Sequence, residues 1–185
     1  MLNKTCGIAG LILTAAALSA LGDEPQKVER PTLIHKELDR LIGTWDVAVE
    51  FRYGDRAMKG TATCEAKWIL DGRFVQQEYT SQFMGKPLKI LQLIGYDDVK
   101  KKLIEIYLAS NRNQVNVNEG EITDGGKIWS NVGELMNVRT QKATRLRTQY
   151  TFHDADRFTL EWFQPDPAAE GKEVRMVSLT HTRKK

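Results

Sequence analysis

The sequence predicts an all-β protein: an antiparallel up-and-down barrel of about eight to ten strands that follows one short N-terminal helix. Apolar and polar residues alternate along many short segments after residue 43, which is the pattern of strands with one buried face. Turn-forming residues such as Asp71-Gly72 separate these segments. The sequence lacks strand–helix–strand alternation, and closure into a barrel would remove the exposed edges that so many strands leave.

The first 22 residues have the features of a secretory signal peptide. One positive charge, Lys4, precedes an apolar run that ends at Leu21, and small residues at positions 20 and 22 match the spacing of a cleavage site. The run is shorter than the roughly 18–20 apolar residues of a spanning helix, and its retention as a membrane anchor is the alternative. We therefore expect cleavage before Asp23, export to the periplasm or the cell exterior, and no stable membrane insertion afterwards.

A single barrel domain is expected to follow the signal. Residues 23–32 are polar, contain two prolines and predict a tether, and residues 33–185 have a suitable length for one barrel. The barrel domain begins with a short helix that ends at Gly43. Four apolar residues share one face of this helix, which we expect to pack on the barrel: Ile34, Leu38, Leu41 and Ile42.

Ten strand-like segments follow the helix. In the first, large residues from Trp45 to Phe51 alternate with smaller or polar ones and share one face. In the second, small residues dominate one face, which suits a tightly curved sheet or space for a ligand. The segments are residues 44–53, 58–70, 73–83, 88–97, 102–110, 113–122, 127–135, 144–154, 156–164 and 173–184.

The start of the first strand resembles a known signature. Gly43-Thr44-Trp45, after a short helix, resembles the Gly-x-Trp motif of lipocalins and their calycin relatives. In that superfamily the Trp closes one end of the barrel, and an Arg of the last strand packs across its ring. The resemblance implies this structural role for Gly43, Trp45 and Arg183, with Arg175 as a second candidate for the cation.

The wider chain resembles a more specific group, the exported bacterial proteins of the family known as domain of unknown function 1579. The matching stretches are "LDRLIGTWDV", "ILDGRFVQQEY", "LIGYDDVKKK" and "THTRK", which occur in the expected order over residues 33–185. The resemblance implies a calycin-like barrel, and it implies no reaction.

Charge and cysteine content exclude several classes of protein. The chain has 27 Lys and Arg against 24 Asp and Glu residues, and its basic runs lie at a predicted turn and at the C-terminus without interleaved aromatic residues. Nucleic-acid binding is therefore not expected, and no pattern indicates an oligomeric state. Once the signal, which holds Cys6, is removed, Cys64 is the only cysteine of the predicted mature chain, which excludes an intrachain disulfide.

No catalytic or metal-binding constellation is recognisable in the sequence. It has no Gly-x-Ser-x-Gly motif, phosphate-binding loop or paired-cysteine cluster, and its three histidines have no second ligand at metal spacing. Haem-binding calycin relatives use a barrel histidine as an axial ligand, so the resemblance implies His181 or His153 as a haem alternative. Apart from that alternative, we expect neither a metal nor a cofactor, and we expect no enzymatic activity.

The barrel interior is the remaining candidate site. We hypothesise that a small apolar or amphipathic molecule binds there, with Gln77 and Gln92 as polar handles. The alternatives are a structural or protein-interaction module of the cell envelope with a filled core, and an enzyme of unassigned reaction. If the apolar face of the first strand looks inward, the lining residues are Val47, Val49, Phe51, Cys64, Gln77, Tyr79, Gln92, Ile104 and Ile106.

Overall fold

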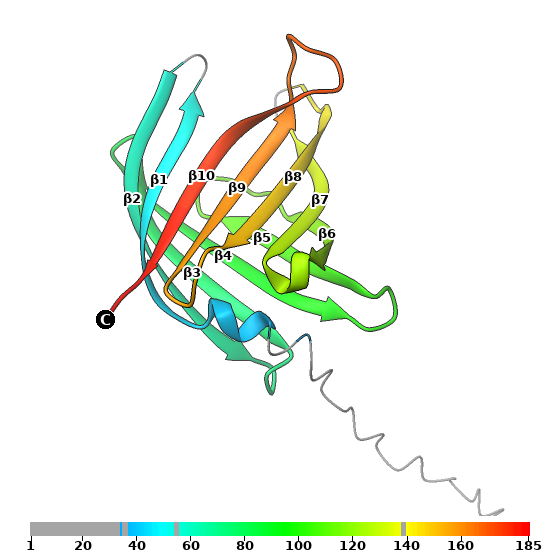
Figure 1. Ribbon diagram of the computed structural model, residues 1–185. Helices are drawn as coiled ribbons and strands as arrows, with labels where there is room; N and C mark the ends of the chain where they lie inside the picture. The colour runs from blue at the N-terminus through cyan, green and yellow to red at the C-terminus, as the bar shows by residue number, and fades with distance from the viewer. Residues whose placement is uncertain (1–33, 35–36, 54–55, 138–139) are drawn as a thin grey trace, which may run out of the picture.

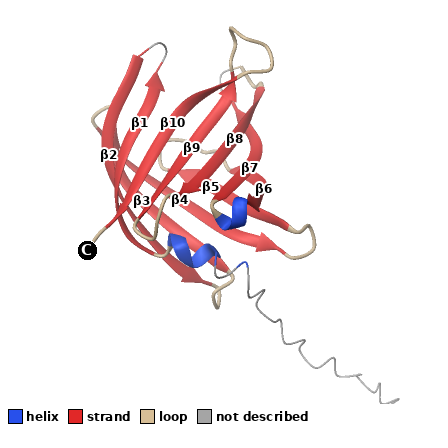
Figure 2. Cartoon of the chain, in the orientation of Figure 1, coloured by secondary structure: helices blue, strands red, loops and turns tan. Residues whose placement is uncertain are grey.

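A computed structural model describes residues 34, 37–53, 56–137 and 140–185, and the strands among them form a closed antiparallel β-barrel (Figures 1 and 2). Each strand pairs with its neighbours in the chain, and β1 pairs with β10 to close the sheet. The prediction of an all-β up-and-down barrel of about eight to ten strands is confirmed. The predicted signal peptide and tether lie outside the described residues. Within the described part, no helix has the length and apolar character needed to cross a membrane.

In the part of the chain that the structure describes, ten strands and two short 3₁₀ helices are complete elements. Helix η1 (Asp39–Leu41) precedes the barrel, and η2 (Asp124–Gly126) lies between β6 and β7. The predicted strand segments match the observed strands in number and order. The strands are β1 (Gly43–Tyr53), β2 (Arg56–Ile69), β3 (Phe74–Phe83), β4 (Lys86–Asp97), β5 (Lys102–Ala109), β6 (Asn116–Thr123), β7 (Ile128–Met136), β8 (Ala143–Phe152), β9 (Arg157–Pro165) and β10 (Glu173–Arg183).

The connections divide the barrel into two ends (Figure 1). Helix η1 and the connections after β2, β4, β6 and β8 lie at one end, the lower one in the view, which we call the closed end. The connections after β1, β3, β5, β7 and β9 lie at the other, which we call the open end. Because successive antiparallel strands run in opposite directions, alternate connections must fall at the same end.

Apolar side chains fill the closed end. Leu38 and Leu41, from the predicted helical face, are fully buried, and the half-buried Ile34 and Ile42 pack against the same core. Inside the barrel, neighbouring aromatic rings lie 4.6 to 5.4 Å apart between centroids, which is the range of favourable ring contacts. This aromatic cluster consists of Trp45, Phe158, Phe152 and Trp129.

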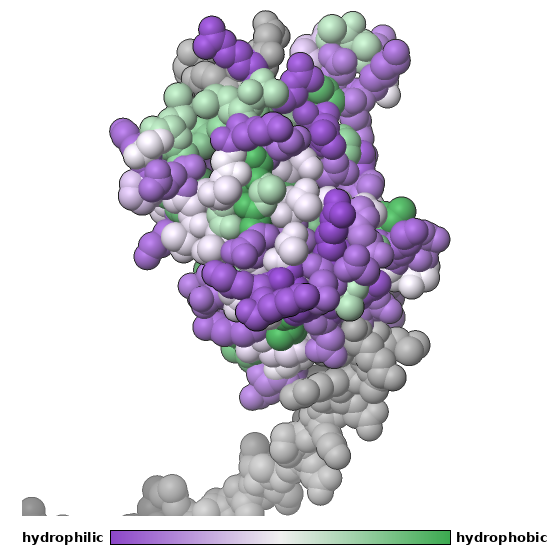
Figure 3. All heavy atoms as spheres, turned by 60° about the vertical axis from the view of Figure 1, so that its left-hand side comes forward, coloured by the Kyte–Doolittle hydropathy of each residue, from purple (hydrophilic) through white to green (hydrophobic). Residues whose placement is uncertain are grey.

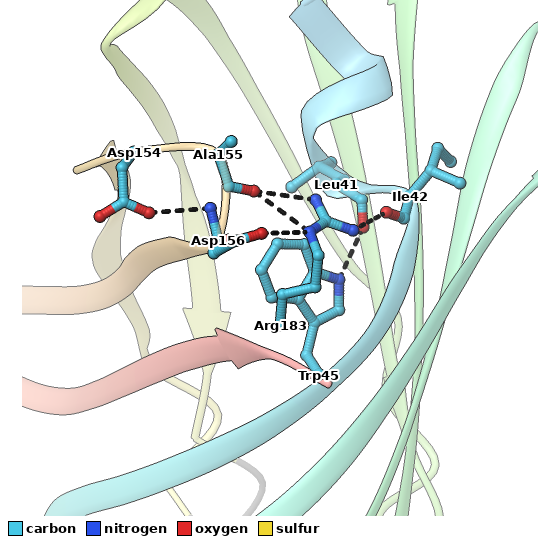
Figure 4. A network of polar contacts seen from close by, with 7 residues as sticks. All are labelled: Leu41, Ile42, Trp45, Asp154, Ala155, Asp156 and Arg183. Atoms are coloured by element: carbon cyan, nitrogen blue, oxygen red, sulfur yellow. Dashed lines mark hydrogen bonds and ion pairs between the residues drawn. The ribbon is translucent and has the colours of Figure 1, made fainter. Parts of the chain in front are cut away.

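Trp45 closes this end and links the helical segment to the barrel (Figure 4). The side chain is 1% exposed, and its indole Nε1 donates a hydrogen bond to the carbonyl oxygen of Leu41 at 2.8 Å. The ring of Phe158 meets the indole edge-on, with the centroids 4.8 Å apart. The hydrogen bond satisfies the polar atom of a buried ring and fixes where the chain enters β1.

Arg183 of β10 stacks on the Trp45 ring (Figure 4). Strand pairing places the two residues opposite each other, and the guanidinium carbon lies 4.1 Å from the ring centroid. Nη1 of Arg183 donates to the carbonyl oxygen of Ile42 at 2.7 Å, and Nη2 donates to that of Ala155 at 3.0 Å. Arg175, the second candidate, is exposed and pairs with a carboxylate of β9, so the implied role belongs to Arg183.

Gly43 is required where the chain enters β1. Its φ is +129°, a conformation that L side chains rarely adopt, and a Cβ built on it would lie 2.5 Å from Nη1 of Arg183. The same nitrogen donates to Ile42. Glycine therefore leaves the space that the guanidinium fills, and the guanidinium covers Trp45. The three signature residues form one packed unit.

Replacing Trp45 by alanine should lower the free energy of unfolding by roughly 3–5 kcal/mol, because it removes a buried aromatic side chain and leaves a cavity. Trp45→Phe keeps most of the apolar volume and loses the Nε1 hydrogen bond, so its loss should be smaller. Urea denaturation followed by circular dichroism measures both. A loss of under about 1 kcal/mol for Trp45→Ala would contradict the role of this residue in the core.

Gly43→Ala should lower the free energy of unfolding by about 1–3 kcal/mol through backbone strain, with a further loss from the clash with Arg183. In an Arg183→Ala background the clash is absent, so Gly43→Ala should be less damaging there. A double-mutant cycle in urea measures this coupling. Simple additivity of the two substitutions would show that Gly43 and Arg183 do not form one unit.

Candidate functional site

The open half of the barrel contains a hollow of about 1450 Å³ that is open to solvent. It extends to the connections of the open end, where Met84 and Asn111 line it. In Figure 3, which turns the left-hand side of Figure 1 forward, apolar residues gather towards this end. Apolar walls with a few polar groups are the usual composition of a small-molecule site. The apolar and aromatic residues of the walls include Phe51, Ile90, Tyr107, Trp162 and Leu179.

The structure brings most of the predicted interior residues together. Cys64 and Gln77 face the interior closer to the closed end and are fully buried. The role of all these residues in ligand binding stays a prediction. The members that line the hollow itself are Val47, Val49, Phe51, Tyr79 and Gln92.

The prediction that Ile104 and Ile106 line the interior is wrong. Along β5 the buried positions include Glu105 and Tyr107, whereas Ile104 and Ile106 are half-buried and belong to the outer wall. Ile106 lies opposite Leu93 of β4, which is also half-buried. Both faces of β5 carry apolar residues. Hydrophobicity alone therefore predicted that the more aliphatic face, with Ile104 and Ile106, would point into the barrel. The face with Glu105 points inward instead, because neighbouring strands supply hydrogen-bond partners for its carboxyl group.

Glu105 is the centre of a polar layer across the barrel interior. The residue is 1% exposed, and none of the ion pairs among the described residues includes it. Hydrogen bonds of 2.6 to 3.3 Å replace the water that its carboxylate loses on burial. Five side chains from β4, β6, β7 and β8 donate them: Gln92 and Tyr150 to Oε1, and Thr148, Asn118 and Asn131 to Oε2.

Two glycines make room for the asparagines of this layer. Gly133 lies opposite Asn118, and Gly120 lies opposite Asn131, on the paired strands β6 and β7. A Cβ on either glycine would lie 2.1 Å from Oδ1 of the facing asparagine. Each asparagine amide therefore lies against a glycine while its nitrogen reaches Glu105. A larger residue at either position would displace a donor of the carboxylate.

Burial and hydrogen bonding act in opposite directions on the pKa of Glu105. Burial raises the pKa, and the hydrogen bonds from its neighbours, Thr148 first, lower it; burial is the larger effect. Because both carboxylate oxygens are already engaged, Glu105 acts as an internal anchor for the strands around it. Gln92 connects this layer to the hollow, since it donates to Glu105 and also lines the hollow.

Tyr79 and His181 form a second polar contact between the hollow and the closed end. The Tyr79 hydroxyl lies 3.0 Å from Nε2 of His181, and the His181 ring stacks on Phe158 with the centroids 4.0 Å apart. Burial lowers the pKa of His181 to about 3, so the imidazole is neutral at physiological pH. Burial likewise raises the pKa of Cys64 to about 12, which keeps the thiol protonated and unreactive.

The histidines implied as haem ligands do not fit an axial role in this arrangement. His153 is exposed in the β8–β9 connection at the closed end, away from the hollow. His181 has its Nε2 beside Tyr79 and its ring face against Phe158. Across the described residues, no group of three His, Cys, Asp or Glu side chains is placed to hold a metal ion.

Sequence reasoning missed Glu105 and most of its donors. The available signal was a glutamate between two isoleucines in an otherwise apolar strand, which is an unusual place for a charge. Its partners on β6 to β8 lie 13 to 45 residues further along the chain. No local pattern links them, because only the closed sheet brings them to one level.

Glu105→Gln should lower the free energy of unfolding by about 1–3 kcal/mol, because an amide nitrogen would face donors and leave them unpaired.

The contribution of Glu105 to stability also depends on pH. Burial raises its pKa above 4.5 in the folded state. Its contribution to the free energy of unfolding is therefore complete below the pKa that it has in the unfolded chain, and it is lost as the pH rises through the pKa that it has in the folded protein. The stability difference between the wild type and Glu105→Gln, measured in urea at several pH values, should therefore shrink as the pH rises. A difference that grows with pH would contradict this.

Comparison with solved structures agrees with the barrel architecture. The chain is similar to Rv2717c from M. tuberculosis, with a TM-score of 0.58 and 14% identity over 84% of this chain and 99% of that chain. It is also similar to the S-type phycobiliprotein lyase CPES from Guillardia theta, with a TM-score of 0.54 and 14% identity over 82% of this chain and 93% of that chain. At these identities the likeness shows the fold alone. No curated protein matches the sequence.

The family comparison covers the whole barrel. Residues 30–183 match the model of the family described as "Protein of unknown function (DUF1579)". The match runs from before the helical segment to Arg183, the last residue of β10. It agrees with the resemblance to this family that the ordered motifs indicated. The chain therefore belongs to the DUF1579 family.

Proposed function

We propose that this protein is an exported, lipocalin-like barrel that binds a small apolar or amphipathic molecule in the hollow of its open half. The observation that carries the proposal is the division of the interior. The closed end is filled by aromatic and aliphatic side chains, whereas the open end contains a hollow of about 1450 Å³ that is open to solvent. A barrel stabilised by its closed half can keep the other half free for a ligand.

The walls of the hollow support an apolar ligand with some polar character. Tyr107 and Trp162 meet edge-on, with the centroids 4.9 Å apart, and present a large aromatic surface. Nε1 of Trp162 is buried and has no hydrogen-bond partner among the described residues. A ligand with one oxygen acceptor along its length would suit such a wall.

The two alternatives have less support. A structural or interaction module with a filled core would need the open half to be packed like the closed half. An enzyme would need an acid, base or nucleophile free to act on a molecule in the hollow. Glu105 is saturated by donors, His181 is engaged by Tyr79, and Cys64 is protonated.

Native mass spectrometry of the protein purified from its own cell envelope tests the proposal. We expect the mature chain, cleaved before Asp23, together with a bound small molecule, or uptake of fatty acids or retinoids at micromolar concentration. A clean ligand-free mass with no uptake of these molecules would contradict binding. An uncleaved chain in the cytoplasm would contradict export and leave the binding result separate.

Gly60 offers a variant that fills the hollow. It lies on the inner face of β2 and lines the hollow, and nothing lies within 4 Å of a Cβ built on it. Gly60→Leu should therefore reduce the binding of an uncharged probe such as Nile red by about tenfold or more, with little loss of stability. Glu65→Leu adds the same side chain to the outer face of the same strand, outside the lining of the hollow, and serves as the control. Equal binding by both variants would show that the probe binds elsewhere.

A further inference from the structure

We propose that the ligand is an anionic amphiphile whose charged head lies at the mouth of the barrel beside Arg112, with its apolar tail inside the hollow. The inference rests on the proposed function, because it concerns the chemistry of the molecule in the hollow. Three features carry it: the position of Arg112, its lack of a carboxylate partner in the described part of the chain, and the lack of a cation in the Glu105 layer beneath the hollow.

Arg112 is held at the interior edge of the rim, in the connection between β5 and β6. Its backbone amide donates to the carbonyl oxygen of Ala109 at 3.2 Å, which turns the chain just beyond β5. The guanidinium carbon lies 5.5 Å from the centroid of the Tyr107 ring. Tyr107 is 6% exposed, faces the interior and lines the hollow together with Arg112. The cation therefore lies over the mouth, not on the outer wall alone.

Arg112 also borders the surface. It lines a second hollow, of about 620 Å³, between the outer sides of β3 and β4 and the β5–β6 connection. The side chain is half-buried, so it is partly dehydrated and still reaches solvent. A charged head group at this position would keep contact with water while its tail is enclosed.

No carboxylate pairs with Arg112 among the residues that the structure describes. Some of the other cations near the open end have such partners: Lys59 pairs with Glu50 at 3.5 Å, and Arg145 pairs with Glu173 at 2.7 Å. A guanidinium over an aromatic ring keeps its planar N–H donors for another acceptor. Anionic oxygen groups match these donors best, because the hydrogen bonds are then charge-assisted.

The layer beneath the hollow sets the orientation of the ligand. Gln92, which lines the hollow, donates to the buried Glu105 at 2.6 Å, and the other donors to Glu105 are also uncharged, so the deep side of the hollow offers no cation to an anionic head. An anionic head placed there would lose its water without gaining a charged partner. The apolar walls between the two levels, such as Ile90 and Leu179, suit a tail. The head therefore belongs at the rim and the tail at depth.

A matched pair of probes tests the inference. Dodecanoate and dodecanol share one tail and differ in the head, so displacement of Nile red by each, at neutral pH and low salt, isolates the contribution of the charge. We expect the wild type to bind dodecanoate about tenfold more tightly than dodecanol. Arg112→Gln should remove this preference, because it should weaken the binding of dodecanoate about tenfold more than the binding of dodecanol. Lys142→Gln, which removes an exposed rim cation that does not line the hollow, should retain the preference.

The outcomes separate this inference from the proposed function. Equal affinity for the two probes in the wild type, or an unchanged preference in Arg112→Gln, would overturn the anionic head at Arg112 while leaving a ligand in the hollow. Binding of neither probe, with no displacement of Nile red by either, would overturn the proposed function itself. A preference that Arg112→Lys partly restores, and that falls as salt is raised, would support a charge contact at this position.

Discussion

Closure of the sheet between its first and last strands is the constraint on which the rest of this structure depends. The pairing of β1 with β10 places Trp45 opposite Arg183, and the guanidinium covers the indole at 4.1 Å. Gly43 is the residue that permits this approach, since a side chain there would occupy the position of Nη1. The same unit carries the helical segment, through the hydrogen bond from Trp45 to Leu41. The same three residues therefore close the sheet, hold the helical segment and fill one end of the barrel.

Trp45 and the aromatic cluster around it allow the two halves of the barrel to differ in how densely they are packed. The aromatic cluster at the closed end supplies the packed core that a domain of this size needs. The open half can then forgo dense packing. Between the halves lies the Glu105 layer, where five donors hold a buried carboxylate and connect β4, β5, β6, β7 and β8. Such a layer resists rearrangement, because the loss of any donor leaves a buried charge less well solvated.

This layered interior bears on function. A solid barrel of the same strands would offer no place for a ligand, and a barrel that was apolar throughout would have no electrostatic direction. Here a carboxylate lies beneath the hollow, and Arg112 lies at its mouth. The cation therefore lies at one end of the hollow only, and an anionic amphipathic molecule bound there would have one favoured orientation.

The sequence by itself determined the architecture. Alternating residues in β1, the Asp71-Gly72 turn and the Gly43-Thr44-Trp45 hinge are local patterns, and they predicted the barrel, the buried face of the helical segment and the family. Tertiary structure alone decided the interior of β5. Both faces of this strand carry apolar residues. Which face points inward, that of Glu105 or that of Ile104 and Ile106, therefore depends on hydrogen-bond donors from strands far along the chain. Whether the open half is filled or hollow is decided in the same way, because it depends on how side chains from all ten strands meet across the barrel and not on the pattern within any one of them.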